Sequence, residues 1–144
     1  MNKNFDQHLA DVVIKEKMLG NDAFSQWLGI EVLEILEDQV VLSMLIRPEM
    51  TNGFGIAHGG IVFSLCDSAF AFASNQYGRK AVSIETNISH LRPLYVSEKV
   101  VAKATLTSLS KSLGRYQVIA TNQENKKVAI FNGTVFYTGE WDVK

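Results

Sequence analysis

The sequence has a single cysteine, Cys66, and this scarcity excludes two kinds of architecture. One thiol cannot form a disulfide within the chain, and it leaves no repeated cysteine spacing for a structural zinc site. His8 and His90 have no partner at the spacing of a metal site or a catalytic triad. No glycine-rich phosphate loop follows a predicted strand. We therefore expect no metal, no cofactor and a reducing environment, and we interpret Cys66 as a buried apolar residue, not as a nucleophile.

The sequence also lacks an excess of charge and any long apolar run. Its 14 lysines and arginines nearly balance 15 acidic residues, and a net charge of −1 gives no indication of the basic surface typical of nucleic-acid-binding proteins. The N-terminal segment carries charges throughout, and no uncharged apolar stretch of about 18 residues follows it. We expect a cytoplasmic protein with no nucleic-acid partner and no membrane partner.

Prolines are few, and no repeat, low-complexity tract or linker divides the chain. The length and the 47% share of hydrophobic residues suit one domain that spans residues 1–144. Residues 1–28 are its predicted N-terminal helical segment. Apolar residues at helical spacing predict a helix over residues 5–18, and Asn21 or Asp22 can cap a second short helix after it.

The rest of the chain predicts an α+β fold. Residues 59–78 are almost free of charge and are apolar nearly all round a helical axis, which is typical of a helix buried on most sides. Runs rich in β-branched residues, separated by polar breaks, predict about six strands. We expect these strands over residues 30–36, 40–46, 81–91, 99–108, 115–121 and 128–137. This pattern predicts a long central helix wrapped by a curved antiparallel sheet, with the short N-terminal helices outside.

Asp67 is the one charged residue of the predicted central helix. A carboxylate on a mostly buried helix is costly unless it is paired, hydrogen-bonded or placed in a polar crevice. Two interpretations are open at this point. Asp67 is either a structural residue bonded to backbone amides or serines, or a base that faces a ligand cleft.

The loop before this helix, residues 51–60, is rich in glycine and leads directly into the helix N-terminus. Glycine lets a ligand approach the backbone. The free N–H groups of a first helical turn can hydrogen-bond a carbonyl oxygen that gains negative charge during acyl transfer. We predict the Gly59 N–H as this donor. The alternative is that the glycines only permit a tight turn.

The spacing of Gly59 and Asp67 adds a constraint. They are eight residues apart, and at about 1.5 Å per residue this is about 12 Å along one helix. They therefore cannot flank the same carbonyl carbon within one chain. If both serve one reaction, the Asp67 beside a given Gly59 comes from another copy of the chain, with two helices antiparallel at a two-fold axis.

The ordered set Asn52, His58, Gly59, Gly60 and Asp67, in the pattern N-x5-H-G-G-x6-D, resembles the hotdog-fold acyl-CoA thioesterases. The segments SLCDSAFAFASNQYG, HLRP and SKSLGRY further resemble the bacterial phenylacetate-degradation (hydroxyphenylacetyl-CoA) branch of that superfamily. The resemblance covers most of the chain. It implies a hotdog fold and a homodimer or a homotetramer built as a dimer of dimers.

The resemblance also implies roles for single residues. It makes Asp67 the general base or nucleophile, and it makes the Gly59 N–H the group that polarises the thioester carbonyl. Asn52 orients the water or the substrate. His58 organises the loop and can also assist the thioester carbonyl. Ser83 falls near the position of a serine that helps to hold the attacking water in some relatives.

The same resemblance implies that coenzyme A binds at the subunit interface, with its nucleotide near the surface. We expect Arg92, Lys111 and Arg115 at its phosphates, although each has the alternative role of a solvated surface charge. We expect Gly114 to keep the neighbouring turn open. Gly60 and Ser112 complete the predicted substrate-binding set.

The predicted activity is hydrolysis of an acyl-CoA thioester to free acid and CoA, without a cofactor, and the resemblance implies an aromatic, phenylacetyl-type acyl group. Two alternatives stay open. A non-catalytic acyl-CoA-binding module needs the fold and the groove but no base. A hotdog dehydratase uses a histidine and an acidic residue across the dimer, here His58 and Asp67. The pattern from Asn52 to Asp67 favours the thioesterase.

Overall fold

A computed structural model describes residues 4–143 of the chain, so residues 1–3 and 144 of the predicted domain lie outside the described part. The helical elements are α1 (Gln7–Asp11), the π-helical η1 (Val12–Met18), the 3-10 turns η2 (Leu19–Asn21) and η3 (Pro48–Met50), α2 (Ala23–Leu28) and α3 (Gly59–Asn75). The strands are β1 (Glu31–Leu36), β2 (Gln39–Leu45), β3 (Arg79–His90), β4 (Lys99–Leu109), β5 (Leu113–Thr121) and β6 (Lys127–Glu140).

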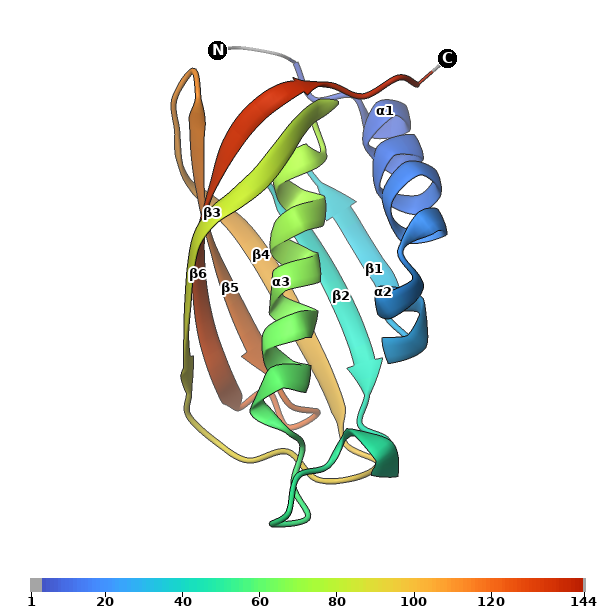
Figure 1. The fold of residues 1–144 in the computed structure, drawn as a ribbon, viewed down its shortest axis with the longest axis vertical. Coiled ribbons are helices and arrows are strands. Elements are labelled where there is room, and N and C mark those ends of the chain that lie inside the picture. The colour runs from blue at the N-terminus through green and yellow to red at the C-terminus, as the bar shows by residue number, and fades with distance from the viewer. Residues whose placement is uncertain (1–3, 144) are drawn as a thin grey trace.

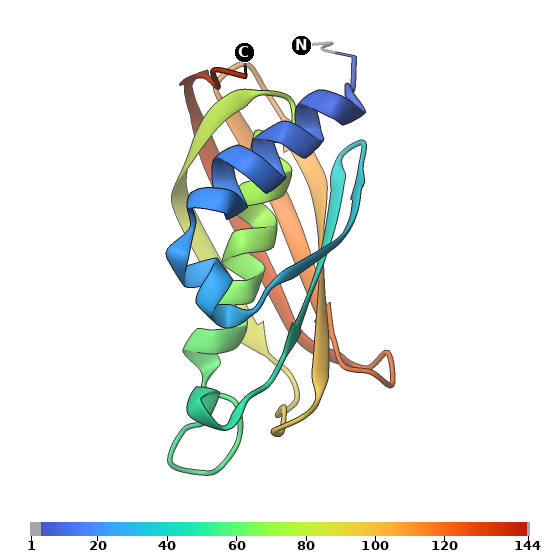
Figure 2. The same ribbon diagram turned by 90° about the vertical axis from the view of Figure 1, so that its right-hand side faces the viewer.

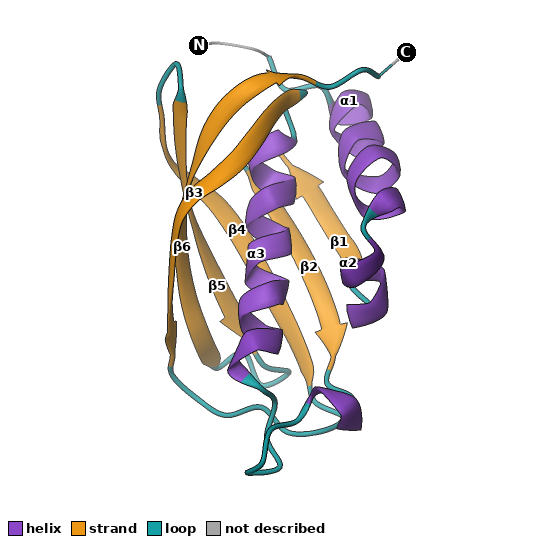
Figure 3. Ribbon diagram, in the orientation of Figure 1, coloured by secondary structure: helices purple, strands orange, loops and turns teal. Residues whose placement is uncertain are grey.

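The six strands form one antiparallel sheet in the order β1-β2-β4-β5-β6-β3. This sheet curls around α3, as Figures 1 and 3 show. The predicted hotdog architecture is therefore confirmed, and all six predicted strands are present with ends that shift by a few residues. Because β1 and β3 are the two edges, each has one side without a strand partner within residues 4–143.

The central helix is shorter than its predicted span of residues 59–78. It ends at Asn75, because Gly78 adopts a left-handed conformation with φ 82° and its N–H donates to the Asn75 carbonyl oxygen at 3.0 Å. The fully buried Gln76 then fastens this end of the helix to the β1–β2 turn. Its amide donates to the Leu36 carbonyl oxygen and accepts from the Asp38 N–H.

The N-terminal helices lie alongside α3, as Figure 2 shows. The single helix predicted over residues 5–18 is wrong in two respects. Asp6 caps the helix by accepting from the Leu9 N–H, so α1 begins only at Gln7. From Val12 the segment becomes π-helical, where three consecutive β-branched residues crowd an α-helical turn. Of the two predicted caps of α2, Asp22 is the one that accepts from the Ser25 N–H.

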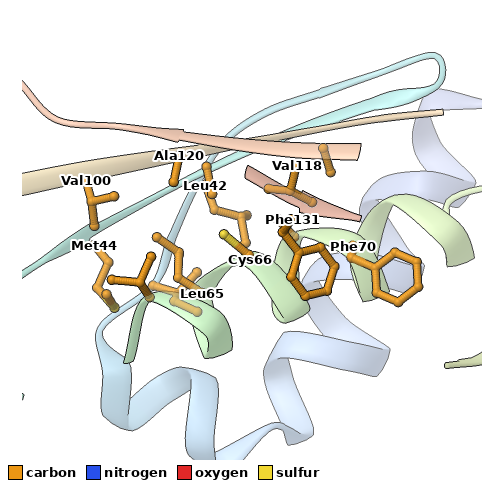
Figure 4. Packing of buried hydrophobic residues seen from close by; sticks show 14 of the residues in the cluster. Leu42, Met44, Leu65, Cys66, Phe70, Val100, Val118, Ala120 and Phe131 are labelled. Atoms are coloured by element: carbon orange, nitrogen blue, oxygen red, sulfur yellow. The ribbon is translucent and has the colours of Figure 1, made fainter. Parts of the chain in front are cut away.

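The core lies between α3 and the concave face of the sheet. Figure 4 shows Leu65, Cys66 and Phe70 of the helix packed against strand residues such as Leu42 and Phe131. Cys66 is fully buried, and burial raises the pKa of its thiol to about 12. A thiol with this pKa stays protonated near neutrality, which supports its interpretation as an apolar core residue. Within residues 4–143, no helix has the length and apolar character that crossing a membrane requires.

Gly133 of β6 lies in close contact with the Phe70 ring of α3. A Cβ placed on Gly133 would lie 2.7 Å from the Phe70 ring, whereas a Cβ on Gly139 of the same strand would meet nothing within 4 Å. We expect Gly133→Ala to lower the free energy of unfolding by about 1–3 kcal/mol through overpacking. Gly139→Ala is the matched control, and it should leave the denaturation midpoint nearly unchanged. Equal midpoints for the two variants in urea titrations would contradict this account of the core.

Candidate active site

The candidate site begins where the loop enters α3. His58 is the N-cap of this helix, and its Nδ1 accepts a hydrogen bond from the Gly60 N–H at 2.9 Å. A ring nitrogen that accepts carries no proton, so in the neutral imidazole the proton is on Nε2. The expected role of His58 as organiser of the loop therefore has a local physical basis, since the imidazole holds the first turn of the helix.

This cap leaves Gly59 as the free donor of the first turn. The Gly60 N–H bonds His58, and the Ile61 N–H donates to the His58 carbonyl oxygen at 2.9 Å. Within residues 4–143 the Gly59 N–H has no acceptor. It also lies at the positive end of the helix dipole, where a developing negative charge is stabilised.

Asn52 shapes the loop that precedes the helix. Its Oδ1 accepts from the Phe54 N–H at 2.9 Å and from the Ile56 N–H at 3.4 Å, which fixes the orientation of the amide. The Nδ2 group has no acceptor among the described residues and lies free to donate. Asn52 therefore combines a structural bond on one side of its amide with an available donor on the other.

A groove of about 420 Å³, here the loop groove, lies at this start of α3. It brings together the predicted residues Asn52, Gly59 and Arg92. It also contains His90, for which sequence spacing indicated no role. The groove is lined by Asn52, Ile56, Ala57, Gly59, Val62, His90, Leu91, Arg92, Pro93 and Leu94. Side chains alternate between the two faces of β3, and His90 pairs with the buried Ala129, so His90 lies on the face toward α3. This alternation is the sequence signal that could have identified His90 as a site residue.

A second groove of about 370 Å³, here the aromatic groove, lies on the other side of the same helix start. His58, Gly60 and Ile61 line it together with Phe24 of α2. Phe24 is half exposed and stacks on Trp27 with ring centroids 6.1 Å apart. The His58-Gly59-Gly60 segment thus contributes to both grooves, with Gly59 in the loop groove and His58 and Gly60 in the aromatic groove.

Asp67 lies two turns further along α3 and is partly buried. Within residues 4–143 its carboxylate has neither a hydrogen bond nor an ion pair, so the structural interpretation of this residue finds no partner there. Burial raises the pKa of the Asp67 carboxyl, and the negative charge of Asp22 raises it further. An unpaired carboxylate with a raised pKa has the properties of a proton acceptor.

The residue next to Asp67 ties α3 to the N-terminal segment. Ser68 Oγ lies 2.8 Å from Ser25 Oγ, and Ser25 Oγ donates to Asp22 at 2.6 Å. Because a hydroxyl has one proton to donate, Ser68 is the donor to Ser25. This chain of hydroxyls holds Asp22 near the position of Asp67.

The remaining predicted residues lie elsewhere in the chain. Lys111 and Ser112 are in the β4–β5 turn, and the Arg79 guanidinium donates to the Lys111 carbonyl oxygen at 2.7 Å. Figure 1 shows this hairpin at the opposite end of the molecule from the start of α3. Arg115 forms an exposed ion pair with Glu85 at 3.8 Å, and Ser83 is exposed on the edge strand β3. Within one chain, these residues are not brought to Gly59.

Gly114 has a different role from the open turn that the sequence suggested. It is a buried residue inside β5, and a Cβ there would lie 2.7 Å from the Tyr137 hydroxyl. Glycine at this position therefore makes room for a side chain of β6. For metals, residues 4–143 contain no group of three or more His, Cys, Asp or Glu side chains that could hold an ion.

Comparisons with known proteins agree with this arrangement. A family model described as the thioesterase superfamily matches residues 54–129. The acyl-coenzyme A thioesterase PaaI of Escherichia coli is 38% identical over 81% of this chain and 83% of its own length. The structure of E. coli PaaI, from the phenylacetic acid degradation operon, superposes with a TM-score of 0.89 at 35% identity, over 93% of this chain and 96% of that one. A hypothetical thioesterase protein of Streptococcus pneumoniae, in a crystal structure with coenzyme A, gives a TM-score of 0.83 at 25% identity, over 88% of this chain and 99% of that one.

The electrostatic coupling of Asp22 to Asp67 can be measured directly. We expect Asp22→Asn to lower the pKa of the Asp67 carboxyl, because it removes one negative charge and leaves burial, the larger cause, in place. Asparagine also caps helices, so α2 should persist. The measurement is a carbon-13 NMR titration of the Asp67 carboxyl.

Asp6→Asn is the matched control, because Asp6 caps α1 in the same way as Asp22 caps α2. It should leave the pKa of Asp67 where it is in the wild type. An unchanged Asp67 pKa in Asp22→Asn would show that the two carboxylates do not interact.

Proposed function

The chain belongs to the thioesterase superfamily, and from this membership we propose that it hydrolyses acyl-CoA thioesters to free acid and CoA at sites shared between two subunits. The observation that carries the proposal is the free Gly59 N–H at the helix start, which lies in the loop groove. Such a donor stabilises the oxyanion of acyl transfer. We further propose that residues 1–144 form one hotdog domain, that the reaction needs no cofactor and that the protein works in the cytoplasm.

In the proposed reaction the thioester carbonyl oxygen accepts a hydrogen bond from the Gly59 N–H. Asp67 of the partner subunit takes a proton from water, whose oxygen adds to the carbonyl carbon, or its carboxylate attacks that carbon itself. Asn52 Nδ2 orients the water or the substrate. The tetrahedral intermediate then collapses, the C–S bond breaks, and CoA leaves as a thiolate that takes up a proton. Where the Asp67 carboxylate is the nucleophile, this step leaves a mixed anhydride on Asp67, which water then hydrolyses to the free acid and the Asp67 carboxylate. A raised pKa makes the Asp67 carboxylate a stronger base than an ordinary aspartate.

The edge strand β3 supports the dimer. It is 12 residues long, and its side chains Val82 and Ile84 are 50% and 58% exposed. A long edge with apolar side chains is a surface on which a second strand adds readily. Antiparallel addition of a second β3 would reverse the partner, so that residues distant from Gly59 in one chain approach it from the other. We propose this homodimer as the active unit, with a homotetramer as a dimer of two such pairs.

The same two-fold arrangement gives the CoA site that we propose. Arg92 lies in the loop groove of one subunit, and Lys111 and Arg115 come from the end of the partner that faces it. Guanidinium and ammonium groups suit the phosphates of the nucleotide. Ser83 of the partner holds the attacking water, and Gly60 and Ser112 complete the substrate-binding set.

For the acyl group we propose an aromatic, phenylacetyl-type substrate. The E. coli relative from the phenylacetic acid degradation operon supports this choice. Phe24 in the aromatic groove supports it as well, since an exposed ring beside His58 and Gly60 offers a stacking surface to an aryl group. A panel of aryl and alkyl acyl-CoAs ranks the substrates.

The first test is release of CoA, detected with a thiol reagent across that panel. We expect Asp67→Asn to lower kcat by about 100-fold or more while the acyl-CoA still binds, because an amide keeps the shape of the carboxyl but cannot accept the proton. Asp11→Asn makes the same chemical change on α1 and should leave kcat unchanged.

The alternatives give different results in this assay. A non-catalytic binding module binds acyl-CoA without release of CoA. A dehydratase that uses His58 and Asp67 converts hydroxyacyl-CoA to an enoyl-CoA and leaves the thioester intact. Either outcome would replace the thioesterase proposal, and normal turnover in Asp67→Asn would remove Asp67 from it.

The shared site predicts complementation between two inactive variants. We expect Asp67→Asn chains mixed with chains that carry Asn52→Ala and His58→Ala to recover up to about one quarter of wild-type activity. With random pairing, half of the dimers are mixed, and each mixed dimer has one intact site of two. If mass spectrometry shows subunit exchange while the mixture stays inactive, Asp67 acts within its own chain.

A further inference from the structure

We propose that His90 contacts the substrate in the loop groove and donates a second hydrogen bond, beside that of the Gly59 N–H, to the thioester carbonyl oxygen. This inference rests on the proposed function, because it requires the reacting carbonyl to lie at Gly59. It adds to the site a histidine that sequence spacing did not select.

The His90 imidazole lies directly beside Gly59. A Cβ built on Gly59 would lie 3.2 Å from His90 Nε2 and 3.4 Å from its Cε1. In an α-helix the Cα–Cβ bond tilts toward the N-terminus, and the free N–H groups of the first turn point the same way. The edge of the imidazole that contains Nε2 therefore lies beside the space that an acceptor of the Gly59 N–H occupies.

The backbone around His90 is held firmly enough to position a catalytic group. His90 is the last residue of β3 and pairs with the buried Ala129. The next two N–H groups, of Leu91 and Arg92, both donate to the Val128 carbonyl oxygen, at 2.8 and 3.3 Å. The imidazole thus projects from an anchored strand end, which places it with more precision than a free loop would.

Two histidines flank the helix start, and they differ in what their rings already bind. Nδ1 of His58 is occupied by the Gly60 N–H. The ring of His90 has no hydrogen-bond partner within residues 4–143, and it lies in the same groove as Asn52 and Gly59. Both ring nitrogens of His90 are therefore uncommitted in the groove that contains Gly59, whereas His58 has one nitrogen occupied and lines the aromatic groove.

The chemistry needs no component beyond acyl-CoA and water. As the water oxygen or the Asp67 carboxylate adds to the carbonyl carbon, the electron pair of the C=O bond moves to the oxygen, which becomes an oxyanion. The Gly59 N–H and the His90 Nε2–H share that charge. When the C–S bond breaks, the pair returns to form the new carbonyl, and His90 keeps its proton throughout. One oxyanion donor contributes a factor of about 100 to 1,000 in kcat.

The same contact gives a reason for glycine at position 59. Any side chain there would press its Cβ against the imidazole at 3.2 Å, which is tighter than ordinary van der Waals contact. A side chain at position 59 would therefore displace the imidazole by a few tenths of an ångström, and glycine lets His90 keep its position beside the free N–H.

The test compares His90→Phe, which keeps an aromatic ring without a donor, with His90→Gln, which keeps an N–H donor. With the acyl-CoA that the wild type hydrolyses fastest, we expect His90→Phe to lower kcat by about 100-fold, with KM changed by less than about threefold. His90→Gln should regain about tenfold of that loss. His8→Phe, at an exposed histidine of α1, is the matched control and should keep wild-type kcat.

The outcomes separate this inference from the proposed function. A wild type that releases no CoA from any acyl-CoA overturns the proposed function. An active wild type with a His90→Phe variant of equal kcat overturns the role of His90. If His90→Phe does not fold, nitrogen-15 NMR of the wild-type histidines tests the contact instead. The probe is an acyl-CoA analogue that keeps the carbonyl and has methylene in place of the thioester sulfur. A change of the His90 Nε2 resonance, without a change at His8, supports the contact, and no change at His90 overturns it.

Discussion

The enclosure of one apolar helix by one sheet governs the rest of this molecule. Because α3 is apolar nearly all round, water has to be excluded from most of its length, and the six strands and the N-terminal helices do so together. What the enclosure leaves open is the N-terminus of the helix and the strip that contains Asp67. Reactive groups of α3 itself can lie only in these two places, and the free Gly59 N–H and the Asp67 carboxylate lie there.

The Gly59 N–H and the Asp67 carboxylate belong to residues eight positions apart on α3, which places them about 12 Å apart on one rigid element. No side-chain movement closes such a distance within a chain. A second copy supplies the missing half only if it runs antiparallel, and the exposed apolar side chains of the edge strand β3 offer a surface for that pairing. The proposed assembly thus follows from the same geometry that separates the groups.

Much of this fold is readable from sequence because its signals are local and agree with one another. The charge-free helix, the alternating strands and the polar turns each predict one element, and all six strands are present. The end of α3 escaped prediction because it depends on the left-handed Gly78 and on bonds from Gln76 to a turn distant in sequence. The π-helical geometry of η1 escaped because spacing alone does not distinguish it from an α-helix.

Some residues of the candidate site can also be predicted from the sequence, and others only from the structure. Asn52, Gly59 and Asp67 stand out by their order along the chain, and the structure adds that only the Gly59 N–H of the first turn is free. His90 became visible only in three dimensions, because it reaches Gly59 across the sheet from 31 positions away in sequence.

The N-terminal segment takes part in this site as well as covering the helix. The bonds from Ser68 through Ser25 to Asp22 place a second carboxylate near Asp67, and its negative charge adds to burial in raising the pKa of Asp67. An α2 helix that moved away would take Asp22 with it and would also admit water to Asp67. Both changes lower the pKa of Asp67, so docking of this segment and the basicity of the proposed catalytic carboxylate are coupled through one short hydroxyl chain.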